Sequence, residues 1–139
     1  MPTSPSAQPA PAVPVRPDRQ PPTLIDCARD LLADSPERTA LTLILPDGTQ
    51  TVSTRAFFEG AARYAHALER AGVRPGDLVV LVLQHGPEVL CSFWGAMLLG
   101  AIPSIMPFLT PKLDPDHYYA GVRQLVALSE VKAVITYPE

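Results

Sequence analysis

The residues of this 139-residue chain that could do chemistry are few and widely spaced. The histidines His66, His85 and His117 lie far apart, and no pair of them has the spacing of metal ligands. Asp114 and Asp116 flank a proline, and although paired acids can serve as general acid and base, acids that begin a helix explain this pair more simply. The sequence therefore predicts no catalytic, cofactor-binding or metal-ligating residue.

The two cysteines, Cys27 and Cys91, form neither a CxxC zinc motif nor a disulfide scaffold. Cys91 lies in an apolar run, which favours a place in the core. The N-terminus lacks the apolar segment that a signal peptide requires. Together these observations predict a cytoplasmic protein.

The charge balance excludes two classes of partner. The chain has 11 basic and 14 acidic residues and a net charge of -3, so it offers no basic surface for nucleic acid or for an anionic membrane. Charged residues make up 18% of the chain, below the typical value of about 25%. This low charge indicates that much of the chain is covered in the folded state.

Residues 1–22 hold eight of the 17 prolines and are predicted to be a disordered leader. The leader satisfies PxxP spacing at Pro11, Pro14 and Pro17, which could dock on an aromatic groove of a partner. Composition alone also produces such spacing in proline-rich segments. Residues 23–139 remain as the folded part.

Helical and strand periodicities predict the helices and strands in the first half of the folded part. Apolar residues recur at helical spacing after Thr23, which can act as an N-cap. Asp47-Gly48 between two β-branched runs is a strong hairpin signal. The expected elements are a helix from Thr23 to Asp34, strands over 39–45 and 49–53, and a helix over 54–71 that is ended by Gly72.

The stretch from Leu78 to Pro111 decides the fold class, because Glu88 is its only unambiguous charge. Residues 78–83 are all apolar without alternation, which is typical of a strand buried on both faces. The expected order is strand 78–83, helix 87–99, buried strand 101–106, helix 114–128 and strand 131–136. Short connections and right-handed crossovers make this a parallel βαβαβ unit covered by helices, which is half of a doubly wound α/β domain.

Residues 89–111 carry no charge and are numerous enough to cross a bilayer. Gly95, Gly100 and Pro103 interrupt this run, however, and no basic flank precedes it. The pattern therefore favours a helix followed by a strand over a membrane span.

The run from Thr51 to Phe108 resembles the start of the adenylate-forming enzymes, which include acyl-CoA synthetases, fatty acyl-AMP ligases and peptide-synthetase adenylation domains. The matching features are Gly72-Val73, Gly76-Asp77 before a Val/Leu strand, Gly95-Ala96, and Leu99-Gly100-Ala101-Ile102-Pro103. The resemblance extends over about Thr23 to Pro138. It implies activation of a carboxylic acid by ATP and Mg²⁺, followed by transfer of the acyl group to CoA or to a carrier-protein pantetheine.

This resemblance also implies that the chain is the N-terminal part of a larger ligase and is truncated relative to the full family fold. The sequence has no Ser/Thr/Gly-rich phosphate loop, no hinge with a C-terminal lid, and no late lysine to offset charge during adenylation. ATP and Mg²⁺ are expected to bind the full-length parent and not this fragment. The expected partner of the fragment is the remainder of the ligase, and the fragment alone is expected to be inactive.

Ligands of doubly wound sheets bind beyond the carboxyl ends of the strands. In this chain that edge comprises Gln84-His85-Gly86, Pro107 to Thr110, and Tyr137-Pro138. Phe108, Leu109, Tyr118 and Tyr119 are candidates to line an acyl or pantetheine channel, which favours a fatty-acyl or polyketide-type acid. The alternatives are that these aromatic residues pack on the core and that His85 is a polar loop residue.

A second interpretation comes from a different class of protein. The chain could be a complete, non-enzymatic α/β interaction module with a proline-rich arm. Its apolar sheet would then be closed by its own helices or by a homodimer.

Overall fold

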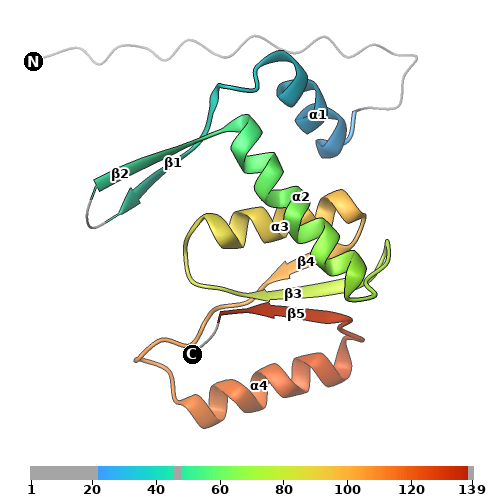
Figure 1. Ribbon diagram of the computed structural model, residues 1–139. Helices are drawn as coiled ribbons and strands as arrows, with labels where there is room; N and C mark the ends of the chain where they lie inside the picture. The colour runs from blue at the N-terminus through green and yellow to red at the C-terminus, as the bar shows by residue number, and fades with distance from the viewer. Residues whose placement is uncertain (1–21, 46–47, 138–139) are drawn as a thin grey trace, which may run out of the picture.

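The computed structural model describes residues 22–45 and 48–137. Almost all of the predicted leader, residues 1–22, and Asp47 of the predicted turn lie outside the described residues. A three-stranded sheet has helices α2 and α3 on one face and α4 on the other (Figure 1). Helix α1 and the hairpin lie at the far end of α2 from this sheet.

Helix α1 (Leu24–Asp34) begins with a reciprocal capping box, as the Thr23 signal predicted. The Thr23 hydroxyl oxygen accepts a hydrogen bond from the Asp26 N–H at 3.1 Å, and the Thr23 N–H donates to Asp26 Oδ2 at 3.0 Å. These two bonds satisfy backbone donors that a helix start leaves unpaired. Ala28 is the residue that α1 buries.

The predicted hairpin is also present. Strands β1 (Thr39–Leu45) and β2 (Gly48–Ser53) pair antiparallel, with Leu45 opposite Gly48. Gly48 has a φ of 144°, a backbone conformation that residues with a side chain rarely adopt. The hairpin leads directly into α2, whose N-cap is Ser53.

Helices α2 (Thr54–Arg70) and α3 (Pro87–Leu99) end in the same way, as the glycines predicted. Gly72 has a φ of 86°, and the Val73 N–H donates to the Leu68 carbonyl at 3.0 Å. Gly100 has a φ of 81°, and the Ala101 N–H donates to the Ala96 carbonyl at 2.9 Å. This is the pattern of a Schellman motif, which returns the chain toward the sheet after each helix.

The sheet confirms the predicted βαβαβ unit. Its strands are β3 (Leu78–Val82), β4 (Ile102–Ile105) and β5 (Ala133–Thr136), all parallel in the order β4-β3-β5, and α4 spans Pro115–Leu128. The central strand β3 is covered on both faces, and Val79, Val80 and Leu81 are fully buried. The main core therefore lies on β3, where Val79 and Leu81 pack with Leu68, Val73, Ala96 and Ala101.

The expectation that residues 101–106 form a buried strand is wrong in part. Ile102 and Ile105 on β4 are each 54% exposed, although Ala101 before them is buried. The reason is the position of β4 at an edge of the described sheet, where β3 covers one side only. Helix α4, on the other face of the sheet, has no buried residue.

Helices α2 and α3 pack together at a glycine and an aromatic cluster. A Cβ on Gly95 would lie 2.6 Å from the Ala61 carbonyl oxygen and 2.6 Å from Tyr64 Cβ. Only the absence of a side chain at Gly95 allows the two backbones to approach this closely. Farther along the same contact, the Phe58 and Trp94 rings meet edge to face, with their centroids 5.4 Å apart.

The uncharged run of residues 89–111 is divided between α3, β4 and the loop after β4. Within residues 22–45 and 48–137, no helix is long and apolar enough to cross a bilayer.

Candidate functional site

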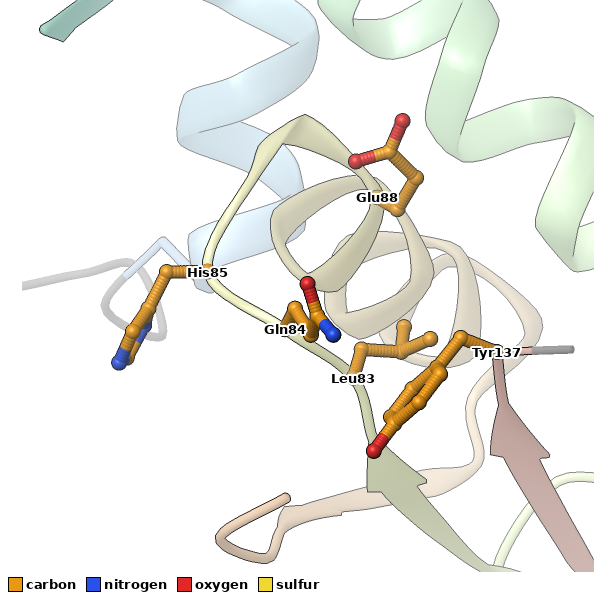
Figure 2. Close-up of a pocket in the computed structure, with 5 residues that line it drawn as sticks. All are labelled: Leu83, Gln84, His85, Glu88 and Tyr137. Atoms are coloured by element: carbon orange, nitrogen blue, oxygen red, sulfur yellow. The ribbon is translucent and has the colours of Figure 1, made fainter. Parts of the chain in front are cut away.

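A hollow of about 350 Å³ lies at the carboxyl ends of β3 and β5. Its lining residues are Leu83, Gln84, His85, Glu88 and Tyr137 (Figure 2). The first three follow β3, Glu88 lies on the first turn of α3, and Tyr137 directly follows β5. The sequence had predicted that loops after these strands would meet, and the structure brings Gln84 and His85 together with Tyr137.

The buried strand β3 positions this hollow. Its buried residues anchor the chain up to Leu83, after which the backbone leaves the sheet at Gln84. Gly86 is extended and makes no side-chain cap, and Pro87 begins α3. Glu88 then stands at the positive end of the helix dipole, which favours its negative charge.

The polar side chains around the hollow do not all point into it. In Figure 2, Gln84 and Tyr137 lie beside Leu83, and Glu88 lies on the helix above them. The His85 ring points away from the other four side chains. It instead meets the Phe108 ring edge to face, with centroids 5.7 Å apart and an interplanar angle of 85°. His85 thereby connects the loop after β3 with the loop after β4.

The loop after β4 is also held by α4. The Tyr118 hydroxyl donates a hydrogen bond to the Pro107 carbonyl at 2.8 Å, and burial raises the pKa of this phenol. A second, mostly apolar hollow of about 300 Å³ lies beside this bond. It is lined by Met106, Pro107, Leu113, Asp114, His117, Tyr118, Gly121 and Val122.

The predicted channel residues therefore separate into different places. Tyr118 lines the second hollow, whereas Phe108 packs on His85. Tyr119 packs edge to face on Tyr118 at 5.5 Å and is 40% exposed. Leu109 is half-buried and lies outside the lining of both hollows, and Pro138 lies outside the described residues.

Two acids have structural roles that the sequence indicated. Asp114 caps α4, and its Oδ1 accepts a hydrogen bond from the His117 N–H at 2.8 Å. Asp116 lies in the first turn of the same helix.

His66 Nδ1 lies 3.9 Å from Glu69 Oε2 on an exposed face of α2. Among the residues that the structure describes, no group of three or more His, Cys, Asp or Glu side chains could hold a metal ion.

The two cysteines differ in their surroundings. Cys27 is exposed on α1, whereas Cys91 is half-buried, with its Sγ 3.8 Å from the Phe57 carbonyl oxygen. Burial raises the pKa of the Cys91 thiol, and the negative charge of Glu88 adds to this effect. A raised pKa disfavours the thiolate, so Cys91 is a packed side chain and not an activated nucleophile.

The lining of the first hollow does not fit a nucleoside triphosphate. Among the residues that the structure describes, this lining contains one carboxylate, Glu88, and neither a lysine nor an arginine. An anionic polyphosphate would be repelled by Glu88, and a single carboxylate is a poor set of ligands for Mg²⁺. Gln84 and Tyr137 can hydrogen bond to a neutral polar group, and no step of phosphate chemistry is assigned to these residues.

Comparison with known proteins identifies the family. A family model described as "AMP-binding enzyme" matches residues 29–139 of this chain, which is most of its length. The chain belongs to the AMP-binding enzyme family. The resemblance to adenylate-forming enzymes is thus confirmed, together with the α/β fold.

Individual relatives of this AMP-binding family member are ligases. A 4-coumarate–CoA ligase from Humulus lupulus is 36% identical over 75 residues, which are 53% of this chain and 12% of the relative. The crystal structure of a fatty acid AMP ligase from Legionella pneumophila matches 81% of this chain with a TM-score of 0.72 and 22% identity. A fatty acyl-adenylate ligase from L. pneumophila in complex with acyl adenylate and pyrophosphate matches the same share with a TM-score of 0.71 and 23% identity.

The chain spans a small part of these relatives. It covers 12% of the Humulus ligase and 19% of each Legionella chain. The Legionella structures therefore show that the fold of the described residues occurs within a much larger ligase.

Proposed function

We propose that this chain forms the first sheet unit of the large domain of an ATP-dependent, carboxylate-activating ligase. The observation that carries this proposal is the AMP-binding family match over residues 29–139, on a chain that folds in the βαβαβ order of the Legionella ligases. The proposed reaction begins when a carboxylate oxygen attacks the α-phosphorus of ATP. The bond to the β-phosphate breaks, pyrophosphate leaves with the electron pair, and an acyl-adenylate forms.

In the second proposed step, a thiol sulfur attacks the acyl carbon and AMP leaves, so that a thioester forms. The thiol belongs to CoA or to a carrier-protein pantetheine. The name of the Humulus relative, a CoA ligase, supports such an acceptor. Mg²⁺ would offset phosphate charge during the first step, and we propose that the reaction takes place in the cytoplasm.

We assign a fatty-acyl or polyketide-type acid to the parent enzyme. Support comes from the Legionella fatty acyl-adenylate ligase, which shares the fold of this chain. The apolar hollow beside Tyr118 and Pro107 is compatible with a hydrocarbon chain at this edge of the sheet.

The 139-residue chain by itself is proposed to be inactive. Within residues 22–45 and 48–137, no lysine or arginine that would offset phosphate charge lines either hollow at the carboxyl edge of the sheet. Its role would be to build the sheet and its edge loops, while other segments of the ligase provide the phosphate and carboxylate contacts.

The test is ATP–pyrophosphate exchange by the longest polypeptide that the reading frame of this chain encodes. Dodecanoate, 4-coumarate and phenylalanine serve as representatives of three substrate classes. Exchange that depends on dodecanoate supports the proposal. Exchange that depends on 4-coumarate or phenylalanine would support the proposed adenylation step and overturn the assignment of a fatty-acyl substrate. Absence of exchange with all three acids would favour the interaction module.

A further inference from the structure

Helix α1 has little buried surface. It contains 11 residues, and isolated helices shorter than about 12–15 residues are marginal in water, so α1 depends on packing for its stability. Ala28 is the residue that it buries, whereas Leu24 and Leu31 are 64% and 37% exposed. The described part of the chain therefore leaves apolar surface of α1 uncovered.

An apolar hollow of about 250 Å³ lies between α1 and the helices α2 and α3. Its lining residues are Ile25, Ala28, Arg29 and Leu32 of α1, Phe58 and Ala62 of α2, and Leu98 of α3. Pockets for drug-sized ligands usually have volumes of about 300–1,000 Å³. This smaller hollow therefore suits a few side chains of a polypeptide better than a cofactor.

The proline-rich leader enters α1 at one end of this hollow. Residues 1–21 lie outside the described residues, and the leader continues into the Thr23 cap and the first turn of α1. Pro11, Pro14 and Pro17 recur at every third position, so they share one face of a polyproline helix, which has about three residues per turn. Such a face docks on apolar grooves that contain an aromatic ring, which Phe58 provides here.

The length of the leader allows it to fold back along α1. Ile25 and Leu32 lie about 10 Å apart along the helix, given the rise of an α-helix. Pro14 and Pro17 lie about 9 Å apart in a polyproline helix. Residues 18–22 then provide up to about 16 Å of extended chain in which the direction can reverse. The segment from Pro14 to Pro17 therefore matches the hollow in length when it runs antiparallel to α1.

The charges of the two segments favour the same arrangement. Residues 1–22 carry two arginines and one aspartate, Asp18, whereas α1 carries three aspartates and one arginine, so their net charges are opposite. Arg29 Nη1 lies 3.5 Å from Asp26 Oδ1, and the Arg29 side chain is 73% exposed. Because a guanidinium has several N–H donors, Arg29 can bind a second carboxylate. With Pro17 beside Ile25, Asp18 would lie within reach of Arg29, one helical turn farther along α1.

We propose that residues 11–18 of the leader bind in the hollow between α1, α2 and α3 of the same chain. Pro14 and Pro17 face into the hollow, and Asp18 pairs with Arg29. The bound leader covers the apolar surface of α1 and holds this helix against α2 and α3. Proline restricts the unbound backbone, so ordering this segment costs less entropy than ordering an average one. The proposal does not rely on the proposed function.

Amide hydrogen exchange of α1 in the 139-residue chain tests the proposal with a matched pair of double variants. Pro14→Ser/Pro17→Ser changes the docking face, and Pro2→Ser/Pro5→Ser makes the same change at the same spacing outside residues 11–18. The first variant should speed exchange of the α1 amides by about fivefold or more, because α1 then opens without a bound leader. The second should leave the α1 rates unchanged.

The amides of α4, on the other face of the sheet, provide an internal control. Their exchange should be the same in both variants and in the unmodified chain. Equal α1 rates in all three proteins would overturn the proposal. Equal acceleration of α1 and α4 in Pro14→Ser/Pro17→Ser would also overturn it, because the leader would then act on the whole fold.

A charge exchange tests the position of the bound leader. Asp18→Arg and Arg29→Asp should each speed exchange of the α1 amides by about twofold, as expected for a pair near the surface. The double variant Asp18→Arg/Arg29→Asp should return the rates toward those of the unmodified chain. Effects that simply add in the double variant would contradict the pairing of Asp18 with Arg29.

Protein concentration identifies the source of the bound segment. If the leader of the same chain occupies the hollow, the α1 amides of the unmodified protein should exchange at equal rates in dilute and concentrated samples. Slower exchange in the concentrated sample would overturn the proposal, because the leader of a second copy would then be the occupant.

Discussion

Replacing Gly95 with alanine should weaken the packing between α2 and α3. The added Cβ would lie 2.6 Å from the Ala61 carbonyl oxygen, 2.6 Å from Tyr64 Cβ and 3.0 Å from the Ala65 nitrogen. Two of these three atoms belong to the backbone, so a rotamer change cannot relieve the overlap. The two helices must instead move apart by roughly 1 Å to restore ordinary contact in a close-packed interior.

The size of the effect follows from two opposing terms. Overpacking of this kind costs about 1–3 kcal/mol, while replacing a helical glycine with alanine returns roughly 1 kcal/mol of helix propensity. The net loss at Gly95 should be about 0–2 kcal/mol of the free energy of unfolding, and it approaches 2 kcal/mol if the helices resist separation. Such a loss is large for a domain whose total stability is about 5–15 kcal/mol.

Gly121 on α4 provides the matched control. A Cβ at Gly121 would have no atom within 4 Å, so Gly121→Ala should raise stability by about 0.5–1 kcal/mol through helix propensity alone. Urea unfolding measures both changes. The fluorescence of Trp94, the single tryptophan of the chain, reports on the α2–α3 contact directly. If Gly95→Ala proved as stabilising as Gly121→Ala, the close approach of the two helices would be refuted.

Three further outcomes follow from the described side chains. At pH 8, iodoacetamide should modify the exposed Cys27 several-fold faster than Cys91, because burial raises the pKa of the Cys91 thiol. Peptide mass mapping of the folded chain measures the two rates. Equal rates would show that Cys91 is accessible. The capping hydrogen bonds from Thr23 lower the pKa of Asp26 below its ordinary value of 3.8, so the stabilisation of α1 is complete above pH 3.8 and is lost as the pH falls through the lower folded pKa. An acid titration followed by circular dichroism measures this loss of helix, which should be absent in the Asp26→Asn variant. Tyr118→Phe removes the donor to the Pro107 carbonyl and should cost about 0.5–1.5 kcal/mol in urea unfolding, and an unchanged midpoint would argue against that bond.

Sequence reasoning succeeded where local chemistry determines local structure. Gly72 and Gly100 end their helices in the predicted conformation because left-handed backbone is costly for other residues. Thr23 caps α1, and the unbroken apolar run of β3 is buried on both faces. The parallel order of the sheet followed from alternating strands and helices with short connections.

The features that sequence reasoning missed depend on distant neighbours. The exposure of Ile102 and Ile105 comes from the edge position of β4, which hydrophobicity alone does not reveal. Gly95 was identified as part of a family motif, but its contact with Ala61 on another helix required the structure. In the sequence, Glu88 stood out only as the single unambiguous charge between Leu78 and Pro111. Its place in the first turn after a buried strand was the signal that it also lines the hollow there.

The central claim is that this chain contributes scaffold to an adenylating ligase while other segments contribute the chemistry. ATP–pyrophosphate exchange by the purified 139-residue chain, measured with saturating dodecanoate and Mg²⁺, tests that claim most directly. We expect incorporation of labelled pyrophosphate no higher than in a sample without protein. Exchange above that background that grows in proportion to the concentration of the chain would contradict it, because the catalytic groups would then lie within these 139 residues.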